Sequence, residues 1–535
     1  MKLTNKIKQL LNSLPIEEKV GQLFVLAFAG EDYDYALQLV KQYHVGGFYI
    51  TDDNAHDIRS ATQLAATLQQ QAALRACDAP LLLAVDQEGA WGILTQQTDV
   101  GPGNLALGKA NDIKLTEQMY RVFAEQMQAI GYNTLLSPCA DVNANPRNPI
   151  IGQRAFGETA NLVSEHVSSA VRGILNTDNF ACAKHFPGHG DTHTDSHQAL
   201  PVVDKSLATL LAEDLAPFIA AIDAGVSMIM TSHINYPQID PQYPATLSHT
   251  ILTDILKHQL GFKGLIITDS MNMWAMRKNY QPAQAAILAL QAGAHLIMLS
   301  EEHYENSTTP YKQIQAQTIQ GVIDAVKCNA LDITVIDRAL EHVLRVKYSG
   351  LKAQATTMTS TESACKAIAT TAAKQAVQIV RNTHQHWPLQ DPHYYLAFAA
   401  DPKGYDSLVN ARGIGPNDPR SAREVILANL NSVKRQFTAV SFVEFKQLLN
   451  AEAQLKTADK IVIVTEDYPL PGEQFDVVAQ TQRVQQALAL WPEQVIVVAM
   501  RSDYELADYA NLGTYVCAYS SRPISAQHIA RLLSQ

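Results

Sequence analysis

The sequence predicts an α/β protein: a (β/α)8 TIM-like barrel followed by a C-terminal α/β domain with a layered sheet. The chain has 535 residues, which is too long for a single domain. Its first part alternates short apolar runs with longer amphipathic ones, as expected for a parallel sheet with crossover helices. Ionisable side chains follow several of these runs, where barrels of this kind carry their chemistry.

Eight apolar runs supply the strands of the predicted barrel. They are residues 23–29, 45–50, 81–86, 134–142, 180–186, 226–234, 265–269 and 296–300. Helical patterns separate most of them, such as residues 61–76 and 162–177. A doubly wound open sheet is the structural alternative, but the chain has neither a GxGxxG nor a Walker-type loop to support it.

The barrel domain is predicted to span residues 1–352, and a helical pattern over residues 334–351 closes it. A short polar stretch, residues 353–360, is predicted to be a linker. The second domain, residues 361–535, begins with an Ala-rich helix expected over residues 363–381. Four later apolar runs predict its strands: residues 394–400, 460–466, 494–500 and 514–520.

The charge and composition of the chain indicate which classes of partner and which compartment to expect. The net charge of −11 argues against nucleic acid or an anionic membrane as the main partner. No window approaches about 18 apolar residues, so no membrane span is expected. The six cysteines show no CxxC spacing, and the N-terminus does not resemble a signal peptide, which together indicate a cytoplasmic protein. Neither a cofactor nor an obligate protein partner is expected.

The most unusual stretch is residues 180–200, FACAKHFPGHGDTHTDSHQAL. An apolar strand breaks at Pro187-Gly188 and continues as a loop rich in histidine and aspartate. Its histidines recur every four residues, which on a helix would make a metal-binding row. The proline and glycines oppose a helix there, and no HExxH glutamate is present, so no metal site is expected.

In a barrel, the carboxyl ends of all eight strands face one mouth. Ionisable side chains, with polar neighbours, follow five of the predicted strands or lie in the connection after the fourth. They are Asp86-Gln87-Glu88, Asp141 with Asn143, Arg154, Lys184-His185, Ser232-His233 and Thr268-Asp269-Ser270. Carboxylates beside Lys and Arg donors suit a polyhydroxylated ligand such as a small carbohydrate.

Five segments carry a resemblance to a known family: VDQEG, IGQRAFGE, KHFPGHGDTHTDSH, MTSHINYPQID and GLIITDSMNM. In this order they resemble glycoside hydrolase family 3, in its two-domain bacterial β-N-acetylglucosaminidase branch, and the likeness spans nearly the whole chain. The resemblance implies a retaining exo-β-N-acetylglucosaminidase. Such an enzyme releases terminal β-linked N-acetylglucosamine from cell-wall or chitin fragments, as in peptidoglycan turnover, without a cofactor.

The resemblance also implies catalytic roles. Asp269 matches the nucleophile that forms a glycosyl-enzyme intermediate; its alternative is a strand-end cap for the next helix. His197 matches the general acid/base, and Asp195, two residues earlier, would orient it. In an extended loop this spacing puts both side chains on one side. A loop-anchoring hydrogen bond between the two is the alternative for that pair.

Further residues match positions that bind the sugar, and some depart from the family. The predicted sugar contacts are Asp86, Arg154, Lys184 and His185, with His233 as a further candidate. Trp91 and Leu94 stand where the family has arginines, and Trp91 could offer a stacking surface for a sugar ring. This departure leaves the exact sugar open.

Three alternative functions follow. The first is an N-acetylglucosaminide phosphorylase, because a neutral histidine repels phosphate less than a carboxylate does; products formed with and without phosphate would discriminate. The second is a family 3 β-glycosidase of other sugar specificity. The third is a catalytically silent sugar-binding protein, which would bind without forming product.

Overall fold

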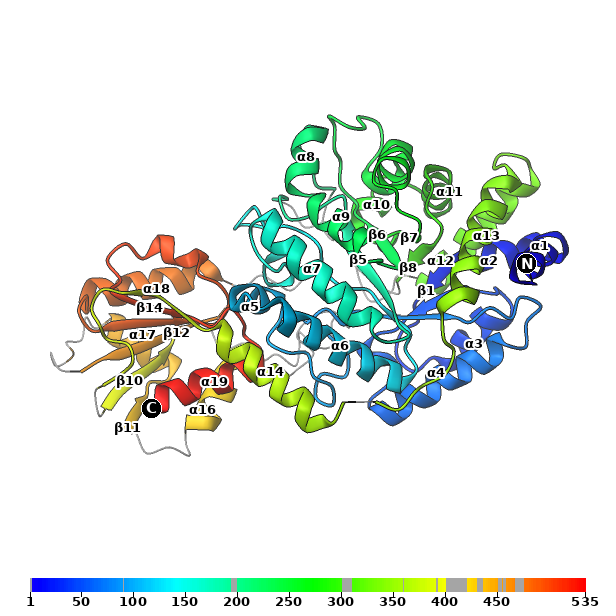
Figure 1. The fold of residues 1–535 in the computed structure, drawn as a ribbon. Helices are drawn as coiled ribbons and strands as arrows, with labels where there is room; N and C mark the ends of the chain where they lie inside the picture. Colours follow the sequence, from blue (N-terminus) through cyan, green and yellow to red (C-terminus); the bar gives the residue numbers. More distant parts are fainter. Residues whose placement is uncertain are drawn as a thin grey trace.

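The computed structural model describes residues 2–89, 91–193, 200–300, 310–358, 360–390, 393–400, 421–430, 436–450, 455, 459–466 and 476–535. These residues form two α/β units, each built around its own sheet (Figure 1). The larger unit carries the N-terminus, and the smaller one carries the C-terminus. The predicted fold class is therefore confirmed.

The larger sheet is a closed parallel barrel of eight strands in the order β7-β6-β5-β4-β3-β2-β1-β8. A bridge between Ile267 and Leu296 joins the two ends of that order. Each strand lies within one predicted apolar run. The strands are β1 (Phe24–Leu26), β2 (Gly47–Tyr49), β3 (Leu82–Val85), β4 (Thr134–Leu135), β5 (Phe180–Phe186), β6 (Met228–Thr231), β7 (Leu265–Ile267) and β8 (Ile297–Leu299).

Helices surround the barrel, and their ends follow from the sequence. In the helix at Ile113–Ile130, the Asp112 side chain accepts from the backbone N–H of Lys114 and Leu115, while Gly131 ends the helix in the left-handed region, with φ of 101°. The helices of this unit are α1 (Lys2–Ser13), α2 (Ile16–Gly21), α3 (Tyr33–Lys41), α4 (Ile58–Ala72), α5 (Asn104–Ala110), α6 (Ile113–Ile130), α7 (Ala160–Leu175), α8 (Leu207–Glu213), α9 (Ala216–Asp223), α10 (Trp274–Arg277), α11 (Pro282–Ala292), α12 (Tyr311–Lys327) and α13 (Ile333–Gly350), with the π-type helix η4 (Thr250–Gln259) and the 3-10 turns η1 (Asp52–Asn54), η2 (Gly152–Arg154) and η3 (Ala245–Leu247).

The second unit is an open sheet in the order β11-β10-β12-β13-β14-β9, in which β9 is antiparallel to β14. Its strands are β9 (Gln378–Asn382), β10 (His393–Phe398), β11 (Gln436–Ala439), β12 (Ile461–Thr465), β13 (Val495–Ala499) and β14 (Thr514–Cys517). Its helices are α14 (Glu362–Ala376), α16 (Ala422–Leu430), α17 (Phe442–Asn450), α18 (Val477–Leu490) and α19 (Pro523–Ser534), with the 3-10 turn η5 (Tyr504–Asp508).

The Ala-rich helix is shorter than the sequence predicts. It ends at Ala376, and Gln378–Asn382 instead pairs with β14 as an edge strand. The strand contains the β-branched residues Ile379 and Val380, which favour a β-strand over the end of a helix. Helix α13 ends at Gly350 and α14 begins at Glu362. The domain boundaries and the linker over residues 353–360 stay predictions.

Helices α5 and α14 lie between the two units (Figure 1). Leu105 and Ala106 of α5 pack in the apolar cluster of the second sheet. In return, Cys365 and Ala369 of α14 pack in the barrel's cluster. The apolar interiors of the two units therefore interlock through these helices. None of the described helices is both long enough and apolar enough to cross a membrane.

Candidate active site

A pocket of about 430 Å³ opens at the carboxyl ends of the barrel strands. Six residues for which the sequence predicts a catalytic or sugar-binding role line it: Asp86, Trp91, Arg154, Lys184, His185 and Asp269. The remaining lining residues are Tyr49, Leu136, Met230, Ser270, Met273, Met298 and Ser300. A few polar groups converge there among apolar walls, as in many small-molecule sites.

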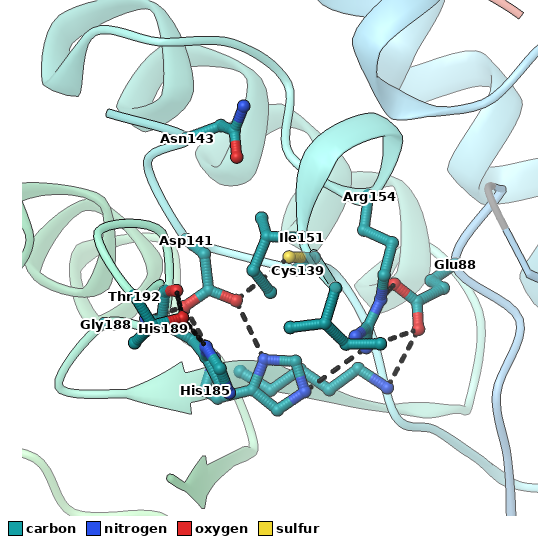
Figure 2. A network of polar contacts seen from close by, with 12 residues as sticks. Glu88, Cys139, Asp141, Asn143, Ile151, Arg154, His185, Gly188, His189 and Thr192 are labelled. Carbon is teal, nitrogen blue, oxygen red and sulfur yellow. Dashed lines mark hydrogen bonds and ion pairs between the residues drawn. The ribbon is translucent and has the colours of Figure 1, made fainter. Parts of the chain in front are cut away.

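Two carboxylates that follow β3 organise the cations of the pocket. Lys184 forms ion pairs with Asp86 and, at 3.1 Å, with Glu88. Arg154 donates through Nε and Nη2 to the two oxygens of Glu88, at 3.0 and 3.1 Å. Burial opposes ionisation of Glu88, but Arg154 and Lys184 outweigh it and lower its pKa to about 2. Glu88 is therefore an ionised, fully buried bridge between two cations (Figure 2).

Lys184 and His185 both line the pocket although successive strand residues normally point to opposite faces. The pairing of β5 with β6 shifts register between Ala183 and Phe186, which locally breaks that alternation. His185 Nε2 faces Arg154 Nη2 at 3.2 Å and can only accept there, because a guanidinium has no acceptor. Its Nδ1–H therefore donates to Asp141 at 2.8 Å (Figure 2). Burial, reinforced by Arg154, lowers the pKa of His185 well below its usual value, so the ring is neutral.

Arg154 is held from three directions. Glu88 and His185 engage its Nε and Nη2 atoms, and its guanidinium carbon lies 3.8 Å from the centre of the Trp91 ring, a cation–π contact. Its backbone carbonyl accepts from Asn104 Nδ2 of α5 at 2.6 Å. Trp91 therefore supports the Arg154 cation by stacking against it. Leu94, the other departure from the family, packs in the barrel core.

Asp269 lies just beyond β7, half-buried at the pocket, and its carboxylate accepts from the Ser270 N–H at 2.7 Å. Ser270 Oγ in turn pairs with Ser300 Oγ at 2.7 Å, which ties the ends of β7 and β8 together. His233 is fully buried behind this wall. Its Nε2 lies 2.9 Å from the Ser270 carbonyl and its Nδ1 lies 2.8 Å from Thr246 Oγ1. The structure thus places His233 in support of Ser270 and not among the residues that line the pocket.

The predicted acid/base pair, Asp195 and His197, lies outside the described residues. The described chain leading to it is anchored on Asp141, whose Oδ1 accepts from the His189 N–H at 2.6 Å. His189 Nδ1 also pairs with Thr192 Oγ1 at 2.9 Å. The roles of Asp195 and His197 stay predictions.

Cys139, Asp141 and His185 place a sulfur, a carboxylate oxygen and a ring nitrogen within 4.8 Å of one another. A metal ion would require a thiolate and an unprotonated ring nitrogen. Burial and Asp141 raise the pKa of the Cys139 thiol well above its usual value, and its Sγ–H donates to Asp141 at 3.2 Å. Arg154 and Lys184 add positive charge next to the group. These donors fit a hydrogen-bond network better than a cation site.

Sequence reasoning missed several residues of the pocket. Glu88 was noted with Asp86 after the third predicted strand but was given no role of its own, and the structure shows it joining Lys184 to Arg154. Tyr49, whose hydroxyl donates to Asp86 at 2.8 Å, ends β2 and has no charge to mark it. The methionines at positions 230, 273 and 298 look like ordinary core residues, and only the closed barrel brings them together.

At the mouth of the closed barrel, carboxylates lie beside Lys and Arg donors in one pocket, an arrangement that can bind a polyhydroxylated ligand such as a carbohydrate. The chain belongs to glycosyl hydrolase family 3, because the model of that family's N-terminal domain matches residues 15–346. The match covers the barrel. It confirms the family that the motifs indicated.

Two curated relatives and one solved structure are similar to this chain. The β-hexosaminidase A of Pseudoalteromonas piscicida is 30% identical over 329 residues, which is 58% of this chain and 54% of that protein. The β-hexosaminidase of Chromobacterium violaceum is 34% identical over 270 residues, 49% of this chain and 73% of that one. This chain thus matches about half the length of the Pseudoalteromonas relative.

The structural likeness extends over both units. A family 3 β-N-acetylglucosaminidase from Paenibacillus sp. FPU-7 is 28% identical and superposes with a TM-score of 0.82, over 98% of this chain and 97% of that one. The barrel and the second unit are therefore arranged as in that structure.

Proposed function

We propose that the protein is a retaining exo-β-N-acetylglucosaminidase that removes terminal β-linked N-acetylglucosamine. One observation carries the proposal: Asp269 lines the same pocket as Asp86, Arg154, Lys184 and His185. That pocket therefore combines a nucleophile with donors and acceptors for sugar hydroxyls. The β-hexosaminidases and the β-N-acetylglucosaminidase that resemble the chain support the choice of sugar.

The chemistry follows from these groups. Asp269 attacks the anomeric carbon, the glycosidic C–O bond breaks, and a glycosyl-enzyme ester forms that water then hydrolyses. The Asp86 carboxylate accepts from sugar hydroxyls, while Lys184 and Arg154 donate to them. Because Glu88 already neutralises much of the cationic charge, these donors can approach each other within one small pocket. Lys184 and Arg154 remain protonated, since Asp86 and Glu88 raise their pKa values against the effect of burial.

The proton transfers are assigned to His197, oriented by Asp195. The leaving oxygen needs a proton in the first step, and water must lose one in the second. A histidine with a pKa near neutrality can do both. Among the described lining residues, His185 does not suit this role, because it is neutral, buried and bonded on both ring nitrogens. This supports placing the acid/base in the DSH segment.

The substrates are proposed to be small fragments of chitin or peptidoglycan. The proposed compartment is the cytoplasm. Six cysteines are present as free thiols, five of them buried, which suits a reducing environment.

The test compares release of nitrophenol from the aryl β-N-acetylglucosaminide with release from the matching β-glucoside. Wild type is expected to prefer the acetamido sugar. Asp269→Ala should lower kcat/KM by about 10³-fold or more, because it removes the atom that forms the new bond. Asp254→Ala, which removes an exposed aspartate on η4, should leave both rates unchanged.

A covalent trap gives an independent readout of Asp269. A glycoside carrying fluorine next to the anomeric carbon and a good leaving group should label the enzyme with one sugar, and mass spectrometry of the digest should place it on Asp269. Turnover of neither glycoside by folded wild type would reject the activity. A label on another residue would reject the nucleophile.

A further inference from the structure

A tyrosine of the second unit contacts the barrel close to the candidate active site. Tyr504 begins η5, which follows β13 of the second sheet. Its hydroxyl accepts from Asn143 Nδ2 at 2.9 Å and donates to Glu158 Oε1 at 2.8 Å. Both partners belong to the barrel. A single phenol oxygen thus joins two points of the barrel that are separated by the segment between residues 143 and 158.

That segment carries Arg154. Asn143 also closes it from within, because its Oδ1 accepts from the Gly152 N–H at 3.2 Å and its own N–H donates to the Gly157 carbonyl at 3.0 Å. Gly152 begins η2, the turn that ends at Arg154. Figure 2 shows Asn143 on the segment between Asp141 and Ile151, away from the ion pairs around Arg154. Tyr504 therefore contacts Asn143, which holds the turn that ends at Arg154, and not Arg154 itself.

The other end of the contact is also fixed. Glu158 forms an ion pair with Lys109 of α5 at 3.2 Å, and the Lys109 carbonyl accepts from Gln378 Nε2 of β9 at 2.9 Å. Gln153 adds a long contact from its Nε2 to the Arg501 carbonyl at 3.5 Å. Tyr504 and Arg501 of the second unit therefore contact this segment without being among the residues that line the pocket. The hydroxyl of Tyr504 is the point where the two ends meet.

The protonation state of the Tyr504 hydroxyl allows it to bond to Asn143 and Glu158 at the same time. Burial, followed by the charge of Glu158, raises the pKa of Tyr504 above its ordinary value. The phenol therefore keeps its proton and can donate and accept at once. Removing it leaves the buried Asn143 amide and the half-buried Glu158 carboxylate without this shared partner, which loosens the segment that both hold.

We propose that Tyr504 is a positioning residue of the second domain, which holds the segment 143–158 so that Arg154 grips the sugar. The proposal rests on the proposed function. It gives the second domain a part in substrate binding without any contact to the substrate.

The kinetic test is Tyr504→Phe, which removes one oxygen. Arg154 contacts the sugar before and during the reaction, so the loss is one of uniform binding. KM for the aryl β-N-acetylglucosaminide should rise about tenfold, equivalent to about 1.4 kcal/mol, while kcat stays within about twofold. The matched control is Tyr509→Phe, another buried tyrosine of the same domain, whose hydroxyl pairs with Glu505. Its kinetic constants should match those of wild type.

A double-mutant cycle separates positioning from general stability. Lysine cannot reproduce the fork of Arg154, so an Arg154→Lys variant has already lost what Tyr504 is proposed to hold. Tyr504→Phe should then raise KM less than about twofold in that background. Equal factors in both backgrounds, or a fall in kcat with unchanged KM, would overturn the role.

Amide hydrogen exchange tests the same idea without a substrate. Peptides that cover residues 143–158 should exchange faster in Tyr504→Phe than in wild type or in Tyr509→Phe, while the rest of the barrel stays unchanged. If wild type releases no nitrophenol, the proposed function fails and exchange decides alone. Faster exchange in this segment would then support the claim that Tyr504 holds residues 143–158, and unchanged exchange would overturn that claim.

Discussion

The charged residues beside the pocket stay ionised although they are buried, because opposite charges face one another. Glu88 is fully buried, yet it is ionised because Arg154 and Lys184 both face it. Glu88 would carry an uncompensated buried charge without the two cations, and Arg154 would do so without Glu88, whereas Lys184 keeps Asp86 as a second partner. Glu88, Arg154 and Lys184 therefore form one electrostatic unit, and a change in any of them affects the other two.

Glu88→Gln should lower the free energy of unfolding of the barrel by about 3–5 kcal/mol at pH 7, as expected for breaking a buried ion pair. The pKa of Glu88 is about 2 in the folded state and about 4.3 in the unfolded chain. Because the folded pKa is lowered, its stabilising effect is complete above about pH 4.5 and is lost as the pH falls toward 2. The gap between wild type and variant should narrow over that window.

Urea unfolding at pH 7 and at pH 3, followed by circular dichroism, measures this gap. The control is Glu117→Gln, which breaks an exposed pair with Arg172 and should cost less than about 1 kcal/mol. A loss at Glu88 no larger than at Glu117 would contradict the compensated-charge account.

At the scale of elements, helix α13 closes the barrel with an unusual contact. Lys347, in its last turn, is fully buried and donates to the Gly46 carbonyl at the start of β2. Burial, with a smaller effect of Arg75, lowers its pKa to about 7. The Gly46 carbonyl also accepts from the Leu82 N–H at 3.1 Å, so it keeps a partner without the lysine. The amine therefore costs stability at neutral pH.

Lys347→Met should raise the free energy of unfolding by about 2 kcal/mol at pH 7, because it removes a buried amine whose protonation folding opposes. Between pH 7 and about 10 the unfolded chain binds the proton that the folded chain lacks, so wild-type stability rises with pH through this group. The variant should lose that rise.

Thermal unfolding at pH 7 and pH 9 measures both effects, with Lys352→Met, an exposed lysine just beyond α13, as the control. A Lys347→Met protein that is less stable than wild type at pH 7 would show that the hydrogen bond outweighs the burial cost.

At the scale of the whole molecule, the two units share apolar surface through α5 and α14. Leu105 and Leu107 lie two residues apart on α5 and are equally buried, at 1% exposure. Leu105 packs with the second sheet, whereas Leu107 packs with the barrel core. One short helix therefore serves both interiors, which keeps η5 against the segment that carries Arg154.

Leu105→Ala should weaken the docking of the second unit by about 2–5 kcal/mol, the cost of a buried Leu→Ala change. Calorimetry should show the second unit unfolding earlier and apart from the barrel. Leu107→Ala, the matched control on the same helix, should lower the barrel transition instead. Identical scans for the two variants would contradict the division of α5 between the two cores.

The sequence by itself determined the order of the barrel strands, the charged residues at their ends and the family. Strand patterns and motifs are local, so apolar runs and the neighbours Lys184-His185 are readable from short stretches. Only the tertiary structure decided that Glu88 joins Lys184 to Arg154, that His233 lies behind Ser270, that Gln378–Asn382 is a strand, and that Tyr504 contacts Asn143. These depend on contacts between segments far apart in the chain, because strand closure and domain docking bring together residues that no local pattern links.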